Sequence, residues 1–178
     1  MEIRKQEAFH AYRGTSKDWG EKWENNKELK FSSGEDEYFG HGCYFFENDY
    51  KEAEFWAKSI RHIEQGNISI IYAYIESKNV YDLIDRETYN DYIKLVEVIS
   101  KRYENEKEKP KINKPYDCNI INMIVDKKKF DMVRGPYNPK HKLGDKLKEN
   151  GDTRMSKTHI QLCVVNKDII KNSEVEYI

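Results

Sequence analysis

The stretch 38–57 constrains the fold more than any other part of the chain, because it joins a tight turn, an apolar strand and a helix start. Gly40 and Gly42 flank a histidine, so the backbone can turn sharply there or let a ligand approach closely. The apolar and aromatic run 43–46 favours a buried strand. A strand that leads into a helix N-terminus can cradle an anionic ligand, although an ordinary strand–helix junction has the same pattern.

The helix that follows this strand has recognisable start and stop signals. Asn48 or Asp49 can cap its N-terminus, and Gly66 can end it. The sequence therefore predicts a helix over 49–65.

Composition limits the classes of protein that this chain can belong to. The 178 residues fit one domain over 1–178, and a net charge of −1 argues against a generally basic nucleic-acid binder, while a local basic patch stays open. Three widely separated cysteines without a Cys-x-x-Cys motif predict neither a disulfide framework nor a metal site. With no signal-peptide pattern and no apolar run near the roughly 18 residues of a membrane span, we expect a cytoplasmic protein without a membrane partner.

The rest of the chain alternates short extended runs with helical patterns. The Ile- and Tyr-rich run 67–76 is the clearest strand, and we expect it at the centre of a sheet. A polar helix through Trp19 and Trp23 has Thr15 or Ser16 as its expected cap. Further helices are expected over 86–103 and 118–125, and further strands over 8–13, 80–84, 130–133, 158–165 and 173–178.

Two polar segments lack any periodicity. The first, 105–115, is charged and contains prolines, so we expect a mobile connection. The second, 137–157, predicts a long loop near a binding cleft, and its lysines and arginine leave a nucleic-acid acceptor open.

Three short motifs resemble those of the ADP-ribosyltransferase fold, in its poly(ADP-ribose) polymerase-like, diphtheria-toxin-like branch with small bacterial or phage members. They are Tyr-Arg-Gly-Thr at 12–15, Phe-Gly-His-Gly-Cys-Tyr-Phe at 39–45 and Gln-Leu-Cys-Val-Val at 161–165. They stand where that branch has a His-Gly-Ser/Thr strand, a Phe-Gly-x-Gly-Ile-Tyr-Phe strand and a Glu-bearing strand. The resemblance implies a single-domain α+β fold with a split, mostly antiparallel β core, flanking helices and a cleft for NAD.

The resemblance also implies a role for each motif residue. Two aromatic rings would stack on nicotinamide, a glycine backbone would bind its carboxamide, and an arginine would anchor the far half of NAD. A glutamine would orient the nicotinamide ribose. The expected catalytic residues are Gln161, Tyr44 and Arg13, and the expected cofactor-binding residues are Arg13, Gly14, Thr15, Ser33, Tyr44, Phe55 and Gln161.

Two of these residues depart from the family pattern. Arg13 replaces the family histidine, and its planar guanidinium can still bind ribose and phosphate groups. Gln161 replaces the catalytic glutamate; it can accept a hydrogen bond from a ribose hydroxyl, but it supplies no negative charge. Each also has an ordinary alternative: a surface arginine at a strand end, and a buried amide bonded to backbone.

The resulting hypothesis is a mono-ADP-ribosyltransferase that uses NAD as substrate, without a metal, and modifies a protein or nucleic acid. Family context adds a toxin or defence role. The alternatives are a non-catalytic module that binds NAD, ADP-ribose or a protein, and an NAD glycohydrolase. Along 158–165, period-two alternation places Gln161 and Cys163 on the face opposite Ile160, Leu162 and Val164.

Overall fold

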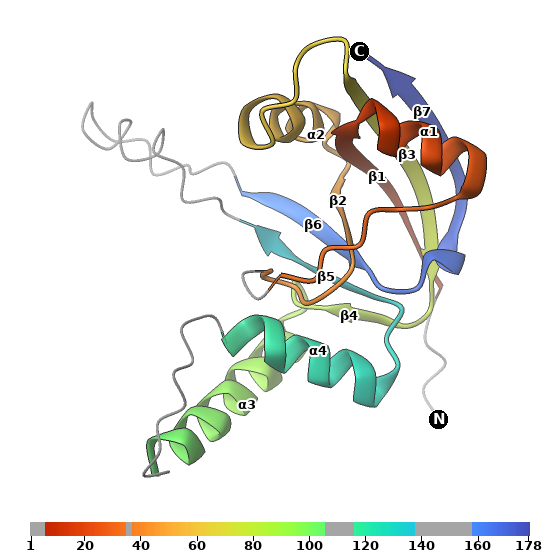
Figure 1. Cartoon of the computed structure of the whole chain (residues 1–178). Coiled ribbons are helices and arrows are strands. Elements are labelled where there is room, and N and C mark those ends of the chain that lie inside the picture. Colours follow the sequence, from red (N-terminus) through yellow and green to blue (C-terminus); the bar gives the residue numbers. More distant parts are fainter. Residues whose placement is uncertain (1–5, 35–36, 106–115, 138–157) are drawn as a thin grey trace.

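Seven strands form one sheet in the order β4-β5-β6-β2-β1-β3-β7 in the computed structural model, which describes residues 6–34, 37–105, 116–137 and 158–178 (Figure 1). The strands are β1 (Glu7–Ser16), β2 (Cys43–Glu47), β3 (Ile68–Ser77), β4 (Val80–Asp82), β5 (Met132–Tyr137), β6 (His159–Val164) and β7 (Ile170–Tyr177). The helices are α1 (Lys17–Asn26), α2 (Tyr50–Phe55), α3 (Arg86–Asn105) and α4 (Tyr116–Lys128), with a π-helical turn η1 (Trp56–Ile60) and a 3-10 turn η2 (Lys167–Ile169). Neighbouring strands are antiparallel, except that β4 and β5 are parallel. The expected single α+β domain with a mostly antiparallel sheet is confirmed.

The sheet consists of two halves that share a very short junction. Strands β1 and β3 pair along ten residues, and β7 extends that half, while β2, β6, β5 and β4 form the other. Between the halves, β1 and β2 pair only at Ala11↔Glu47 and Tyr12↔Phe46. The two strands therefore diverge beyond Tyr12, and the β core opens there within an otherwise continuous sheet.

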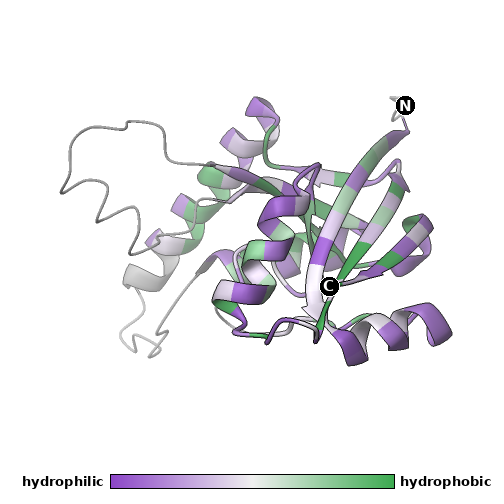
Figure 2. Ribbon diagram, turned by 90° about the horizontal axis from the view of Figure 1, so that it is seen from above, coloured by the Kyte–Doolittle hydropathy of each residue, from purple (hydrophilic) through white to green (hydrophobic). Residues whose placement is uncertain are grey.

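Alternation along the strands divides the core between the two faces of the sheet. One face packs Phe45 and Leu162 against Trp23 of α1. On the opposite face, one cluster around Cys163 lies beneath α3 and α4, and a second cluster lies beneath α2. Figure 2 shows the apolar residues concentrated on the strands. The opening between β1 and β2 thus lies between α1, which packs on one face of the sheet, and α2, which packs on the other.

The helix predicted over 49–65 ends five residues early, at Ile60. Asp49 does cap it, because its Oδ1 accepts a hydrogen bond from the Glu52 N–H at 2.9 Å. The helix then widens into η1, where the Arg61 N–H bonds the Trp56 carbonyl five residues back. His62 follows with a φ of 52°, which ends the helix well before Gly66.

The strand predicted over 130–133 is shifted along the chain. Lys129 has a φ of 58°, so Phe130 belongs to the turn after α4, and β5 runs from Met132 through Tyr137. Pro136 fits inside this strand because β4 pairs with β5 only as far as Arg134. On the side of β5 that faces β4, no described backbone acceptor needs the N–H that proline lacks.

The other expected elements are present with modest changes. The strand expected over 67–76 is β3, but it lies next to the edge strand β7 and not at the centre of the sheet. Ser16 is the N-cap residue of α1, although its side chain forms no capping hydrogen bond. The segments expected as a connection and a long loop lie outside the described residues, except for Asn105 and Tyr137, which end α3 and β5. None of the helices in the described ranges is long and apolar enough to cross a bilayer.

A half-buried group of three charged side chains connects strands β2, β4 and β5. The Arg134 guanidinium contacts Glu47 of β2 at 2.7 and 3.1 Å and Asp82 of β4 at 2.9 Å. The three side chains are only 18%, 12% and 22% exposed. Removing the arginine would leave two poorly hydrated carboxylates without their cation.

We therefore expect Arg134→Met to lower the free energy of unfolding by about 2–3 kcal/mol. The control is Lys94→Met, because Lys94 pairs with Asp91 at 3.0 Å between side chains that are 72% and 77% exposed. Such a surface pair contributes at most about 0.5 kcal/mol. Urea unfolding of both variants measures the difference, and equal losses would contradict the structural role of Arg134.

Candidate functional site

A cavity of about 440 Å³ opens where β1 and β2 diverge. It is lined from β1, β2, β5 and β6, from α1 and η1, and from the segment between α1 and β2. Its charged lining residues are Arg13, Lys30, Arg61 and Glu37. Its aromatic lining residues are Trp19, Tyr38, Tyr44, Phe46, Trp56 and Tyr137. An excess of cations beside many aromatic rings suits an anionic ligand that carries planar rings.

Arg13 fills the gap between the two strands with its side chain. Its Nη1 donates to the Tyr44 carbonyl at 3.1 Å, and its Nη2 donates to the Lys30 carbonyl at 3.0 Å. Burial lowers the pKa of the guanidinium below its ordinary value. Among the described residues no carboxylate forms an ion pair with it. A half-buried cation that is bonded only to carbonyl groups favours an anionic group in the adjoining cavity.

The Arg13–Tyr44 hydrogen bond replaces the bond that the Gly14 backbone would form to Tyr44 in a regular sheet. Continuing the β1–β2 register from Tyr12↔Phe46 by two residues would pair Gly14 with Tyr44, but the strands do not pair there. The Arg13 side chain supplies the donor to the Tyr44 carbonyl instead. On this side of β1 the His10 carbonyl accepts from the Asn48 N–H, and alternation puts the Gly14 N–H and C=O on the same side. Gly14 therefore presents its backbone to the cavity, as the resemblance implies.

Gly14 is also required by the packing of α2 against β1. A Cβ atom at this position would lie 2.0 Å from the Ala53 carbonyl oxygen. Both Ala53 and Ala57 have no exposed surface, so this side of the helix has no room to adjust. The same glycine serves the packing and the cavity.

The Tyr44 ring lines the cavity, and its hydroxyl forms hydrogen bonds with nearby backbone. The hydroxyl donates to the Gly40 carbonyl at 2.6 Å and accepts from the Phe39 N–H at 3.1 Å. Burial raises the pKa of this phenol far above its ordinary value, so it stays neutral. The ring is held in place at the cavity wall by the turn that contains Gly40.

Gln161 lies at the cavity with its amide unused by the fold. The residue is 5% exposed and pairs with Phe46 of β2 and Gly135 of β5. Its side-chain amide forms no hydrogen bond to any residue of the described ranges. The predicted alternation is confirmed, because Cys163 packs beneath α4 whereas Leu162 and Val164 pack on the other face. The amide is thus placed to bind a ligand.

Five of the seven residues that the resemblance selects line this cavity, and two do not. Thr15 does, whereas Ser33 and Phe55 are not among the lining residues; their neighbours Ser32 and Trp56 are. Phe55 is 38% exposed, because the side of α2 that carries Ala53 faces the sheet and Phe55 points away from it. The expected second stacking aromatic is therefore not at the cavity.

Trp56, Tyr137 and Tyr38 supply aromatic rings to the cavity wall, where Phe55 was expected. Trp56 lies 6.0 Å from Tyr137 between ring centroids, in an edge-to-face arrangement, and the Tyr38 ring lies 5.4 Å from Tyr137. Sequence reasoning missed Tyr137, because its place depends on how far β5 continues its pairing with β6. It also missed Lys30 and Arg61, which no recognisable motif marks.

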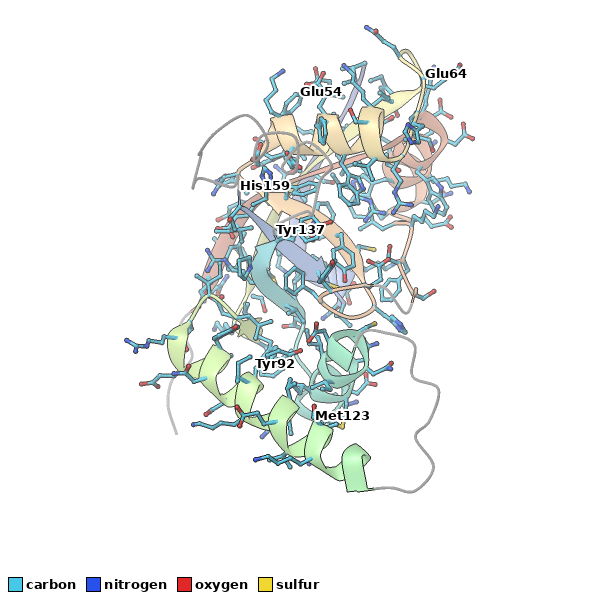
Figure 3. All side chains as sticks on the ribbon, turned by 90° about the vertical axis from the view of Figure 1, so that its left-hand side faces the viewer. Glu54, Glu64, Tyr92, Met123, Tyr137 and His159 are labelled. Atoms are coloured by element: carbon cyan, nitrogen blue, oxygen red, sulfur yellow. The ribbon has the colours of Figure 1, made fainter. Side chains whose placement is uncertain are left out.

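A buried histidine between two carboxylates lies next to the cavity. The Nδ1 of His159 is 3.0 Å from Asp49 Oδ2, and its Nε2 is 3.1 Å from Glu52 Oε2. His159 precedes Gln161 by two residues on the same face of β6, and it packs edge-on against Phe46. In Figure 3, His159 and Tyr137 lie between α2 and the α3–α4 pair. These contacts fix the start of α2 to β6.

Comparison with protein-family models, with curated proteins and with solved structures finds no match to this chain. Among the described residues no group of three or more His, Cys, Asp or Glu side chains is arranged to hold a metal ion.

The close approach of α2 to Gly14 makes a testable prediction. Gly14→Ala should lower the free energy of unfolding by about 3 kcal/mol or more, because the added methyl overlaps backbone that cannot move away. The control is Gly66→Ala, where no atom lies within 4 Å of the added Cβ and only the φ of 87° is unfavourable. That variant should lose about 1 kcal/mol. Equal losses in chemical unfolding would contradict the packing argument.

Proposed function

We propose that this protein is an NAD-dependent mono-ADP-ribosyltransferase. The observation that carries the proposal is that Arg13, Gly14, Tyr44 and Gln161, from three different strands, line one cavity. The resemblance selects these residues from motifs far apart in the sequence.

The chemistry of the cavity supports a dinucleotide ligand. NAD carries two phosphates, two planar heterocycles and two riboses, and this lining offers three cations and six aromatic rings. Arginine binds phosphate and ribose oxygens through several donors at once, and aromatic walls stack on planar rings. The volume of about 440 Å³ lies in the range of small-molecule sites.

Each residue has a role in holding the substrate. The Gly14 backbone N–H and C=O would bind the carboxamide of nicotinamide, and the Tyr44 ring would stack on its heterocycle. Trp56 or Tyr137 would take the place of Phe55 on the other side of that ring. Arg13 would anchor the adenosine half, and the Gln161 amide would accept a hydrogen bond from the ribose 2′-hydroxyl.

The reaction breaks the bond between the ribose C1′ and the nicotinamide nitrogen. The bonding electrons leave with nicotinamide, which departs neutral, and the ribose becomes oxocarbenium-like. A nucleophile of the acceptor forms the new bond to C1′ and releases its proton to solvent. Since Gln161 supplies no negative charge, catalysis depends mainly on positioning, which favours a single transfer to an already nucleophilic acceptor.

One observation favours a second candidate, a non-catalytic module that binds NAD or ADP-ribose. The cavity presents a neutral amide where a carboxylate would stabilise the cationic ribose, so binding could persist without turnover. Hydrolysis of NAD without an acceptor is a third outcome. Incubation of the protein with labelled NAD, with and without cell lysate, distinguishes the three by free nicotinamide and by label bound to macromolecules. A toxin or defence role remains part of the proposal only through the family context.

Gln161 provides the sharpest test of catalysis. We expect Gln161→Ala to reduce nicotinamide release by about tenfold or more with less effect on NAD binding, because this hydrogen bond strengthens as the ribose becomes cationic. Gln161→Glu should retain or increase turnover, because a carboxylate stabilises the developing charge. Asn90→Asp, which adds the same charge on the exposed part of α3, is the control and should change nothing.

Melting temperatures of the same proteins separate this role from a structural one. If Gln161 serves only the core, both substitutions lower stability, and the glutamate is worse because an unpaired charge is buried. Unchanged turnover in Gln161→Ala would remove the residue from the mechanism. A wild-type protein that is stabilised by NAD but releases no nicotinamide would replace the transferase with the binding module.

A further inference from the structure

A second cavity, of about 390 Å³, lies on the β1–β3–β7 half of the sheet beside the start of α2. The two cavities have no lining residue in common among those that the structure describes. Its walls carry four aromatic side chains and two carboxylates: His10, Tyr12, Tyr50, Tyr72, Glu174 and Glu176. We refer to it as the tyrosine–glutamate pocket.

The strand registers build this pocket row by row. Tyr12 of β1 is opposite Tyr72 of β3, which is opposite Glu174 of β7. In the next row on the same face, β7 contributes Glu176 opposite Ile70. Residues two apart on a strand point to the same face, so both carboxylates border the pocket along its β7 side.

The aromatic rings beside those carboxylates contact one another. The ring centroids of Tyr12 and Tyr72 are 5.5 Å apart, and Tyr50 of α2 approaches Tyr12 edge-on at 5.8 Å. His10 stacks on Tyr72 at an interplanar angle of 21°, and its Nδ1 is 2.7 Å from the Tyr72 hydroxyl. These mutual contacts hold the rings in fixed positions, so little side-chain freedom is left to lose when a ligand binds.

The charge of the pocket is negative. Glu174 and Glu176 are both exposed, and the described residues that line the pocket include no lysine or arginine. Burial and a hydrogen bond to Glu176 raise the pKa of Tyr50 to about 12. Lys51 lies 5.5 Å from the Tyr50 ring centroid, but its Nζ is bonded to Glu54 on the outer side of α2. The part of the pocket that the structure describes therefore has carboxylates and ring faces but no lysine or arginine in its lining.

We propose that the tyrosine–glutamate pocket binds an arginine side chain of a partner protein. A guanidinium stacks its plane on aromatic rings and donates parallel hydrogen bonds to carboxylates, and both kinds of group are present here. A lysine ammonium could use the charge but has no flat surface to stack. Anionic ligands are excluded by the two glutamates. This inference does not depend on the proposed reaction with NAD.

The test is an NMR titration of the uniformly ¹⁵N-labelled full chain with N-acetyl-arginine amide. N-acetyl-citrulline amide, which has the same shape without the charge, and N-acetyl-lysine amide are the matched ligands. We expect saturable shifts confined to β1, β3, β7 and the start of α2, with a Kd on the order of millimolar, because an isolated side chain makes few contacts. The arginine ligand should bind about tenfold more tightly than the citrulline ligand.

Protein variants locate the binding. Glu174→Gln combined with Glu176→Gln should weaken arginine binding by about tenfold. Glu64→Gln combined with Glu97→Gln changes the net charge equally at exposed sites outside the pocket lining, and it should leave binding unchanged. Tyr72→Leu should also weaken binding, and the amide spectrum shows whether that variant is folded. Equal binding of arginine and citrulline, equal binding of arginine and lysine, or unchanged binding in the Glu174/Glu176 variant would each overturn the proposal.

Discussion

The hydrogen bond from the Arg13 side chain to the Tyr44 carbonyl sets the geometry of the candidate site. In a regular sheet the next donor to that carbonyl would be the backbone N–H of Gly14. Because a side chain takes that place, β1 and β2 separate without leaving the carbonyl unsatisfied. The separation opens the cavity, turns the Gly14 backbone toward it, and leaves a half-buried cation at its edge. The half-buried cation at the cavity and the break in the sheet thus have one cause.

Most of the residues at this site also serve the fold. The Arg13 side chain donates hydrogen bonds to two backbone carbonyls, and the Tyr44 hydroxyl bonds the turn at 39–40. Gly14 has no Cβ, which leaves room for α2 to pack closely against β1. We therefore expect substitution of any of them to change stability, whatever its effect on a ligand. Gln161 differs, because its amide bonds no described residue although it is 5% exposed.

The sequence predicts the strands of this site better than it predicts the helix beside them. Local patterns are sufficient for β2, β3 and β6, and alternation along β6 correctly separates Gln161 from Leu162. Phe55 was selected by the resemblance alone, and in the structure Trp56, one position later, lines the cavity in its place. Tyr137 and the rows that combine Tyr72 with Glu174 depend on strand register between distant segments, which a single sequence does not specify.

A crystal structure of the chain grown with NAD or a non-hydrolysable analogue would show whether the opening between β1 and β2 binds NAD. We expect the carboxamide against the Gly14 backbone, the nicotinamide ring on Tyr44, and the ribose within hydrogen-bond distance of the Gln161 amide. Calorimetry on the same protein and ligand should show saturable binding. An empty cavity at saturating ligand, or a ligand bound away from Arg13 and Gln161, would contradict the account.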